Sequence, residues 1–324
     1  MSTLVSLGCS WTYGVGVGFD ESTMWNSEDG IQNKKFPYNY TKQQYNNIKG
    51  AEYPSYEDFI KNRKNKDFFK NHIWEELLDY AKTATIDSEY FFKKYSKISH
   101  NKSIADEYSF RGIISKSLDL KNNNFSSGGS SNDMQFFQLA RIFGNPIKRK
   151  KFIESKPIIL WGITSTARIM RNDRSFLLTH SESDSKELQE YIRLYLKLGF
   201  YNHDESLEDL SYKIEIWNTI FENYNIPVLW FDTFNTHDYK IKPRNFLTDG
   251  DLLTQMLKIS KTKYKSFLNL YHFSSWIQDD PRITAAVKAK LLNPHSFHPT
   301  KQGHKVISEI LLPHIKELNK IYYN

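Results

Sequence analysis

Three short runs of strand-forming residues constrain the fold of this chain most strongly, and they are Thr3–Leu7, 157–162 and 226–231. The first is a β-favouring run that ends at Gly8. The second and third are apolar runs of the kind typical of strands buried on both faces of a parallel sheet. A helical pattern over residues 207–224 separates the second run from the third, so the order strand, helix, strand indicates a βαβ unit. The sequence predicts an α/β fold with a mostly parallel sheet.

The remaining patterns fill in one enlarged domain that spans residues 1–324. Residues 19–105 are dense in Tyr, Phe, Asn and Lys and contain no clear strand, which predicts a mainly helical insertion. A second insertion is predicted at about 235–292. Further patterns predict helices over 109–117, 133–143 and 303–322, and a polar loop that bears glycine over 122–131.

Composition narrows the classes of partner and compartment. The 44 basic residues are spread along the chain against 37 acidic ones, and no zinc-finger or RNA-binding signature accompanies the basic run at 148–151, so no nucleic-acid partner is predicted. Cys9 is the single cysteine, which excludes an intramolecular disulfide and fits a reducing compartment. The first residues lack the pattern of a secretory signal, and no apolar run approaches the roughly 18 residues of a membrane span. We therefore expect a soluble, cytoplasmic protein without a membrane partner.

Ser10 is the first candidate for chemistry, because it follows the first predicted strand within Gly-Cys-Ser-Trp-Thr-Tyr-Gly at 8–14. Ligands of parallel α/β sheets gather beyond the carboxyl ends of the strands. A serine hydroxyl becomes a nucleophile when a base removes its proton, and the oxyanion that develops then needs hydrogen-bond donors. His298 is the candidate base, and Gly128 or Gly129 in the predicted loop is the candidate donor. An isolated Gly-x-Ser can equally be a turn or a helix cap.

These segments resemble the SGNH or GDSL-type hydrolases. Ser10 between Gly8 and Gly14 is similar to the first block of that family, which carries the nucleophile, with Cys9 in place of the usual Asp. The loop at 127–132 is similar to the second block, whose glycine contributes to the oxyanion hole. Residues 158–165 match the position of the third block, and His-Pro at 298–299 with Gly-His at 303–304 resembles the fifth. The resemblance implies a flavodoxin-like three-layer α/β/α sandwich, with Ser10 as nucleophile and His298 as base.

Two positions depart from the family pattern. The third block carries an Asn that donates to the oxyanion, and Thr164 stands in its place; Asn132 is a candidate substitute. The fifth block carries an Asp three residues before the histidine, and His295 stands there. A neutral histidine can orient His298 but stabilises its imidazolium less than a carboxylate does. Other acids could replace the missing one in space, and these are Asp232, Asp279 and Asp280.

Other residues are candidates for binding rather than for the reaction. Arg168 follows the third strand and could bind a substrate carboxylate or sulfate, or pair with an internal acid. Gly128, Asn132 and Trp11 are further candidates for substrate contact. The histidines at 295, 298 and 304 raise the alternative of a zinc site, but their spacing is a weak signal and we predict no metal. Asp232, His237 and Asp238 form a second polar cluster after a predicted strand, for which a structural role is the preferred interpretation.

Two functions fit these residues. The first is a serine hydrolase that acts on the ester bond of a small molecule or glycan through an acyl-enzyme on Ser10, without a metal or organic cofactor. The alternative is a chain that kept the fold and lost catalysis, and that now serves as a binding or structural module. An oligomer or a larger assembly is compatible with either function.

Overall fold

A four-stranded sheet lies at the centre of the computed structural model, which describes residues 1–14, 17, 102–171, 174–178, 186–234, 236–263, 281–292 and 298–323. Its strands are β1 (Thr3–Leu7), β2 (Lys121–Asn124), β3 (Pro157–Ile163) and β6 (Val228–Asp232). They run in the spatial order β2-β1-β3-β6, and every neighbouring pair is parallel. The predicted α/β fold with a parallel sheet is confirmed.

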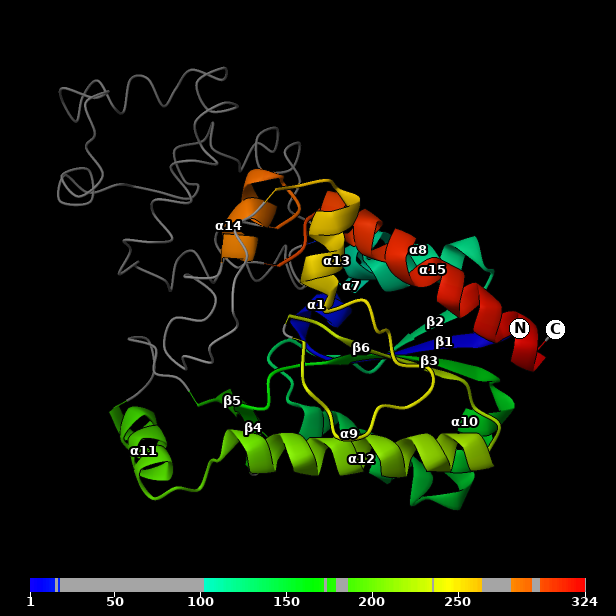
Figure 1. Cartoon of the computed structure of the whole chain (residues 1–324). Coiled ribbons are helices and arrows are strands. Elements are labelled where there is room, and N and C mark those ends of the chain that lie inside the picture. The colour runs from blue at the N-terminus through cyan, green and yellow to red at the C-terminus, as the bar shows by residue number, and fades with distance from the viewer. Residues whose placement is uncertain are drawn as a thin grey trace, which may run out of the picture.

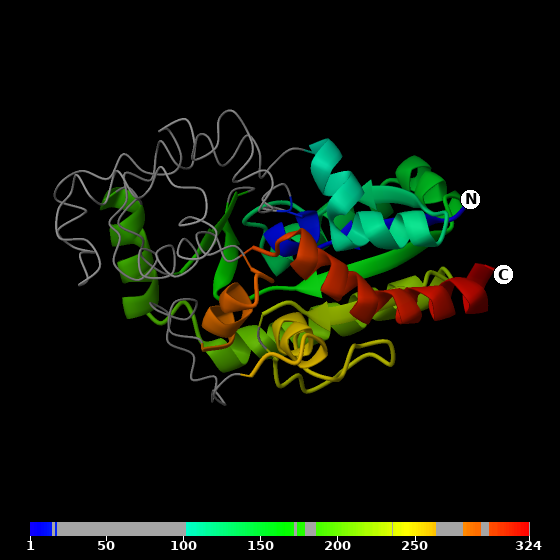
Figure 2. The ribbon, with the colours of Figure 1, turned by 90° about the horizontal axis from the view of Figure 1, so that it is seen from above.

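One helical layer covers the face of the sheet that carries Leu4, Leu160 and Phe231. It contains α7 (Lys102–Tyr108), α8 (Phe110–Ser117), α13 (Leu252–Ile259), α14 (Pro281–Lys288) and α15 (Lys301–Tyr323). Figures 1 and 2 show α8, α13 and α15 above the strands. Apolar side chains of α13 and α15 pack on the strands in one cluster, so this layer is bound through a continuous core.

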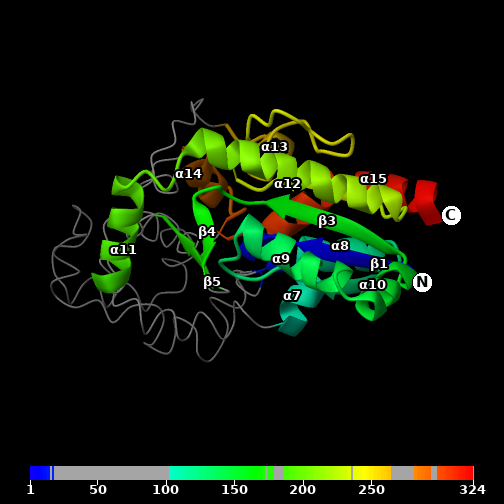
Figure 3. The same cartoon turned by 90° about the horizontal axis from the view of Figure 1, so that it is seen from below.

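The second layer covers the opposite face, which carries Val5, Trp161 and Trp230. It contains α9 (Asn132–Phe143), α10 (Pro146–Glu154) and α12 (His203–Asn223), and Figure 3, which is seen from below, shows these helices on the viewer's side of the sheet. The indole rings of Trp161 and Trp230 stack at 4.6 Å between ring centroids, next to Phe221 of α12. Two faces covered by helices give the three-layer α/β/α sandwich that the resemblance implied.

A hairpin and a further helix extend beyond the carboxyl edge of the sheet. The hairpin pairs β4 (Arg168–Arg171) with β5 (Arg174–Leu177) in antiparallel register, directly after β3. Helix α11 (Lys186–Lys197) follows, and Figure 3 shows it beyond the hairpin, away from the sheet. The hairpin therefore adds a wall to the edge at which β1 and β3 end.

The two predicted insertions are described to different extents. Of the range 19–105, only residues 102–105 are described, and they belong to α7. The described part of 235–292 supplies α13 and α14. Their side chains Leu253, Met256 and Val287 are fully buried in the core between this helical layer and the sheet. Phe246 from the same range also forms a parallel bridge with Trp230 beside β6. This range therefore helps to complete the sandwich.

One local prediction was wrong. Residues 122–131 were expected to form a polar loop, but Lys121–Asn124 is the edge strand β2, paired with β1 from Thr3 to Ser6. Among the described strands, only β1 pairs with β2, and the polar Lys-Asn-Asn-Asn residues suit this edge position, where they are half-buried or exposed. The loop begins after Asn124.

No helix in the described ranges combines the length and the apolar composition that crossing a bilayer requires.

Candidate active site

The strand order reverses at β1, and two loops follow the strands at that point. β2 and β3 flank β1 on opposite sides, and the helices that lead to them, α8 and α9, lie on opposite faces of the sheet (Figure 1). Ligands of such sheets bind outside the carboxyl ends of the strands at this reversal. Here the ends of β1 and β3 lead into residues 8–10 and 164–167, so this edge is the candidate active site.

Ser10 begins α1 (Ser10–Tyr13) directly after the turn that follows β1. The turn requires glycine, because Gly8 has a φ of +142° and a Cβ there would lie 2.9 Å from the Gly162 carbonyl oxygen. Cys9 and Trp11 are fully buried or nearly so, whereas Ser10 is partly exposed. Ser10 is therefore accessible at the carboxyl edge of the sheet.

The glycine loop lies beside this turn. The Ser127 amide donates to the Gly8 carbonyl at 3.4 Å, and Ser131 caps α9 by accepting from the Met134 amide. Gly129 is exposed, with a φ of +74°. Within the described residues, the backbone amides of Gly129 and Ser10 donate no hydrogen bond, so both remain available to a ligand oxygen.

Gln135 links the same two loops, and no sequence pattern had singled it out. Its Oε1 accepts from the Gly8 amide at 3.2 Å, and its Nε2 donates to the Ser130 hydroxyl. It lies one helical turn after the cap residue Ser131, on the buried side of α9. A buried polar side chain at that position of the predicted helix was the available signal.

Asn132 and Thr164 form a buried reciprocal pair. Asn132 Nδ2 donates to the Thr164 carbonyl at 2.8 Å, and the Thr164 amide donates to Asn132 Oδ1 at 2.9 Å. Both residues are buried, and Thr164 Oγ1 has no hydrogen-bond partner within the described residues. The Asn132 side chain thus fixes the backbone after β3, and the Thr164 amide is already occupied.

Asn132→Ala is expected to lower the free energy of unfolding by about 2 kcal/mol, because it leaves a buried amide and a buried carbonyl of Thr164 unpaired. Urea-induced unfolding followed by circular dichroism measures the change. Asn223→Ala, at an exposed position near the end of α12, is the matched control and should change stability little. Equal stabilities of the two variants would contradict the role assigned to Asn132.

His298 lies just before α15, in a segment fixed by its neighbours. Pro299 forms a bridge with Leu292, and the Thr300 amide donates to the Leu291 carbonyl at 3.0 Å. In the described part of the chain, the Ser10 hydroxyl forms no hydrogen bond with His298. Hydrogen bonds of this kind are often long in a protein without its ligand, so the pairing stays a prediction.

The acid that would support His298 is not identified. His295, Asp279 and Asp280 lie outside the described residues. Asp232 is committed elsewhere: its Oδ1 accepts from His237 Nδ1 at 2.8 Å and from the Tyr239 hydroxyl.

That second cluster is a buried network at the end of β6. Asp232 Oδ2 also accepts from the His237 amide at 3.0 Å, and both side chains are almost completely buried. Asp238 is exposed and points to no partner in this network. The hydrogen bonds close the loop after β6 on itself, in agreement with the structural role preferred from the sequence.

His304 is a core residue of α15. It is fully buried, and its Nδ1 accepts from the Phe110 amide at 3.3 Å. Burial, followed by electrostatic effects of Arg111 and His298, lowers the pKa of His304 to about 3. The folded chain therefore holds this imidazole neutral at pH values where an exposed histidine is charged.

The pKa of His304 predicts a loss of stability in acid. The unfolded chain takes up a proton at His304 below about pH 6.5, and the folded chain does so only near pH 3. Protonation of His304 therefore does not reduce the unfolding free energy above about pH 6.5. Below that pH it reduces the unfolding free energy by about 1.4 kcal/mol per pH unit as the pH falls towards 3. His304→Asn removes this titration, and its unfolding free energy should depend less on pH. Parallel profiles of the two proteins between pH 7 and 5 would contradict the assignment.

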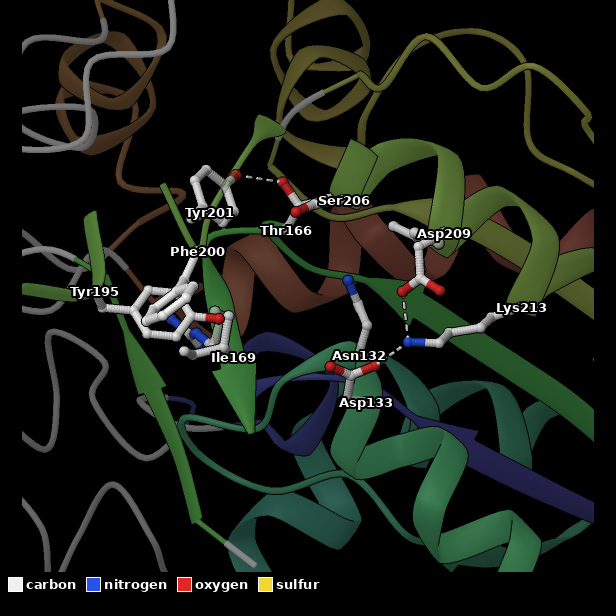
Figure 4. A pocket seen from close by; sticks show the side chains of 12 residues that line it. Asn132, Asp133, Thr166, Ile169, Tyr195, Phe200, Tyr201, Ser206, Asp209 and Lys213 are labelled. Carbon is white, nitrogen blue, oxygen red and sulfur yellow. Dashed lines mark hydrogen bonds and ion pairs between the residues drawn. The ribbon is translucent and has the colours of Figure 1, made fainter. Parts of the chain in front are cut away.

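A cavity of about 190 Å³ opens between the start of α9, the hairpin and α12. Figure 4 shows its walls, to which Tyr195, Phe200 and Tyr201 contribute aromatic rings. Lys213 lies in the cavity between two carboxylates, 2.8 Å from Asp133 and 2.6 Å from Asp209 (Figure 4).

Arg168, the first residue of β4, also lines this cavity. Its Nη1 atom is buried, and no hydrogen bond or ion pair of its guanidinium forms within the described residues. The sequence left open whether Arg168 binds a substrate or pairs with an internal acid. No described acid pairs with it.

Trp11 takes a core position instead of a position against the cavity. Its indole is 2% exposed and packs edge-on against Phe234, with ring centroids 4.6 Å apart. The predicted substrate contact of Trp11 therefore has no support in the structure.

In the described part of the chain, no three His, Cys, Asp or Glu side chains are grouped to hold a metal ion.

Comparisons with known proteins identified no relative of this chain. No protein-family model, no curated protein and no solved structure matches the chain. The candidate site is therefore interpreted from its own geometry.

Proposed function

We propose that this chain is a serine hydrolase of the SGNH type that cleaves an ester bond. One observation carries the proposal: Ser10 is accessible at the reversal point of a parallel sheet, and its own amide and that of Gly129 have no partner in the described residues. A nucleophile with two available amides nearby is the minimum that acyl transfer needs. The four motif resemblances along the chain support the same interpretation, as does the strand order.

The proposed reaction runs through an acyl-enzyme. Ser10 Oγ attacks the acyl carbon while His298 takes its proton, and the amides of Ser10 and Gly129 hold the oxyanion. The tetrahedral intermediate then releases the alcohol, which receives the proton from His298. Water attacks the acyl-enzyme with His298 again as base, and the acid leaves as Ser10 is restored. The ester C–O bond is replaced first by the bond to Ser10 Oγ and then by the bond to the water oxygen, so water is the one co-reactant.

Pre-steady-state hydrolysis of 4-nitrophenyl acetate tests this reaction. An acyl-enzyme predicts a burst of nitrophenolate that matches the enzyme concentration, followed by slower steady turnover. The control is the same assay with the His298→Gln protein. Linear release of nitrophenolate by the wild-type protein, without a burst and at the rate of this control, would count against the proposal.

The cytoplasmic location is also a proposal, and it rests on the single cysteine.

A second function is favoured by the occupied partners near Ser10. Asn132 holds the Thr164 amide, and Asp232 holds His237, so two groups that could have supported the reaction are engaged in structural contacts. A chain that kept the fold and lost the reaction would show this arrangement, and would serve as a binding or structural module. Absence of the acyl burst in folded protein would favour this second function.

A further inference from the structure

Arg168 is half-buried and its Nη1 atom is fully buried, yet its guanidinium has no anionic or carbonyl partner within the described residues. Two buried arginines of the described chain show the usual arrangement. Arg111 Nη1 lies 2.7 Å from Asp106, and Arg282 Nη1 lies 2.8 Å from Asp251. An unpaired cation removed from water destabilises a fold, so structural arginines are paired. Arg168 departs from that pattern.

No acid that lines the cavity forms a direct ion pair with Arg168. Asp133 and Asp209, which also line it, already bind Lys213 between them. These three side chains carry one positive and two negative charges, but both carboxylates are turned towards the lysine. Burial lowers the pKa of Arg168, and the thiol of Cys9 is the group that opposes this effect. A ligand anion would relieve the desolvation of the guanidinium.

The topology places Arg168 and the candidate nucleophile at the same edge of the sheet. β1 and β3 are parallel neighbours, and Ser10 follows β1 whereas Arg168 follows β3. Arg168 is also tied to the end of β3, because its amide donates to the Ser165 carbonyl at 3.1 Å. Arg168 thus belongs to the edge at which Ser10 lies.

We propose that Arg168 binds a carboxylate of the substrate, and that the substrates are esters that carry this carboxylate on a ring. This inference rests on the proposed ester hydrolysis, which makes the bound molecule a substrate. The planar guanidinium can bind a carboxylate through two parallel hydrogen bonds. Tyr195, Phe200 and Ile169 provide an apolar wall against which a sugar or aromatic ring packs.

Calorimetric titration of the Ser10→Ala protein tests the binding without turnover. The probes are two matched pairs, benzoate with benzamide and glucuronate with glucuronamide, and they separate an aromatic from a sugar carboxylate. At least one carboxylate is expected to bind about tenfold or more tightly than its amide, and Arg168→Gln should remove that difference. Arg193→Gln, which changes an exposed arginine of α11 paired with Glu190, is the matched control and should preserve it.

Several results would overturn the assignment. These are equal affinities of acid and amide, an unchanged carboxylate affinity in Arg168→Gln, absence of binding by both acids at millimolar concentration, or tighter binding of inorganic sulfate than of either acid. Because Ser10 is absent from the titrated protein, failure here leaves the hydrolase proposal intact. Failure of the hydrolase proposal likewise leaves a measured carboxylate site intact.

Thermal unfolding gives an independent test that does not need a ligand. Replacing an unpaired, half-buried cation by an apolar side chain is expected to raise Tm by about 2 °C, so Arg168→Met should be more stable than wild type. Arg111→Met should be less stable, because it leaves the bonded Asp106 and Asn122 without their partner. A fall in Tm for Arg168→Met as large as that for Arg111→Met would show a structural arginine and overturn the proposal.

Discussion

Ser10→Ala is expected to lower kcat/KM for ester hydrolysis by about 1,000-fold or more while the chain remains folded. The hydroxyl is the group that forms the acyl-enzyme, and the rest of the site can only hold the ester near water. Ser10 is partly exposed and its side chain makes no hydrogen bond within the described residues, so its removal should not affect stability. Steady-state hydrolysis of 4-nitrophenyl acetate measures the loss.

The matched control is Ser117→Ala, at the end of α8. Its hydroxyl donates to the Ile113 carbonyl at 2.8 Å on an exposed surface, and its loss should leave the rate unchanged. Adding His298→Gln to Ser10→Ala should cause little further loss, because nucleophile and base act as one unit. A Ser10→Ala protein with at least half of the wild-type rate would contradict the assigned role.

Asp251→Ala is expected to give the largest loss of stability, about 3–5 kcal/mol of unfolding free energy. Asp251 is fully buried, caps α13 through the Thr254 amide at 2.9 Å and accepts from Arg282 of α14 at 2.8 Å. Thr236, from the loop after β6, donates to the same carboxylate at 3.2 Å. Without the carboxylate, the buried Arg282 loses the ion pair that it forms with Asp251. Urea-induced unfolding measures the difference.

A double variant separates the lost ion pair from the lost cap. Asp251→Ala with Arg282→Met removes both charges and should recover much of the loss, whereas Glu190→Ala, which breaks an exposed pair with Arg193, should change little. A double variant no more stable than Asp251→Ala would show that the ion pair is not the source of the effect.

The α/β class and the parallel sheet could be predicted from the sequence because three of the strands are buried on both faces. The runs of β3 and β6 are almost entirely apolar, that of β1 is β-favouring, and the helical pattern between β3 and β6 indicates a βαβ unit, so the parallel sheet follows. The strand β2 could not be predicted in this way. It is a polar edge strand of Lys and Asn residues, and its pairing with β1 depends on a partner far away in the chain.

The candidate site was predicted less completely than the fold. The sequence indicates where Ser10 and Gly129 lie, because the ends of parallel strands meet at one edge. It cannot indicate that Asn132 pairs with Thr164, or that Asp232 pairs with His237 and is unavailable to His298, since these choices depend on side-chain conformation. Nor can it distinguish the paired Arg111 from Arg168, which no described acid pairs, because tertiary contacts decide whether a carboxylate lies beside an arginine.

The nucleophile can be identified directly by labelling with a fluorophosphonate and locating the adduct by peptide mass spectrometry. An activated serine attacks the phosphorus and displaces fluoride, whereas an ordinary serine hydroxyl does not react. The account predicts one adduct, on the peptide that contains Ser10, and its absence from the folded Ser10→Ala protein. Folded wild-type chain that remains unlabelled, or labelling that persists in Ser10→Ala, would contradict the assignment of Ser10 as the nucleophile.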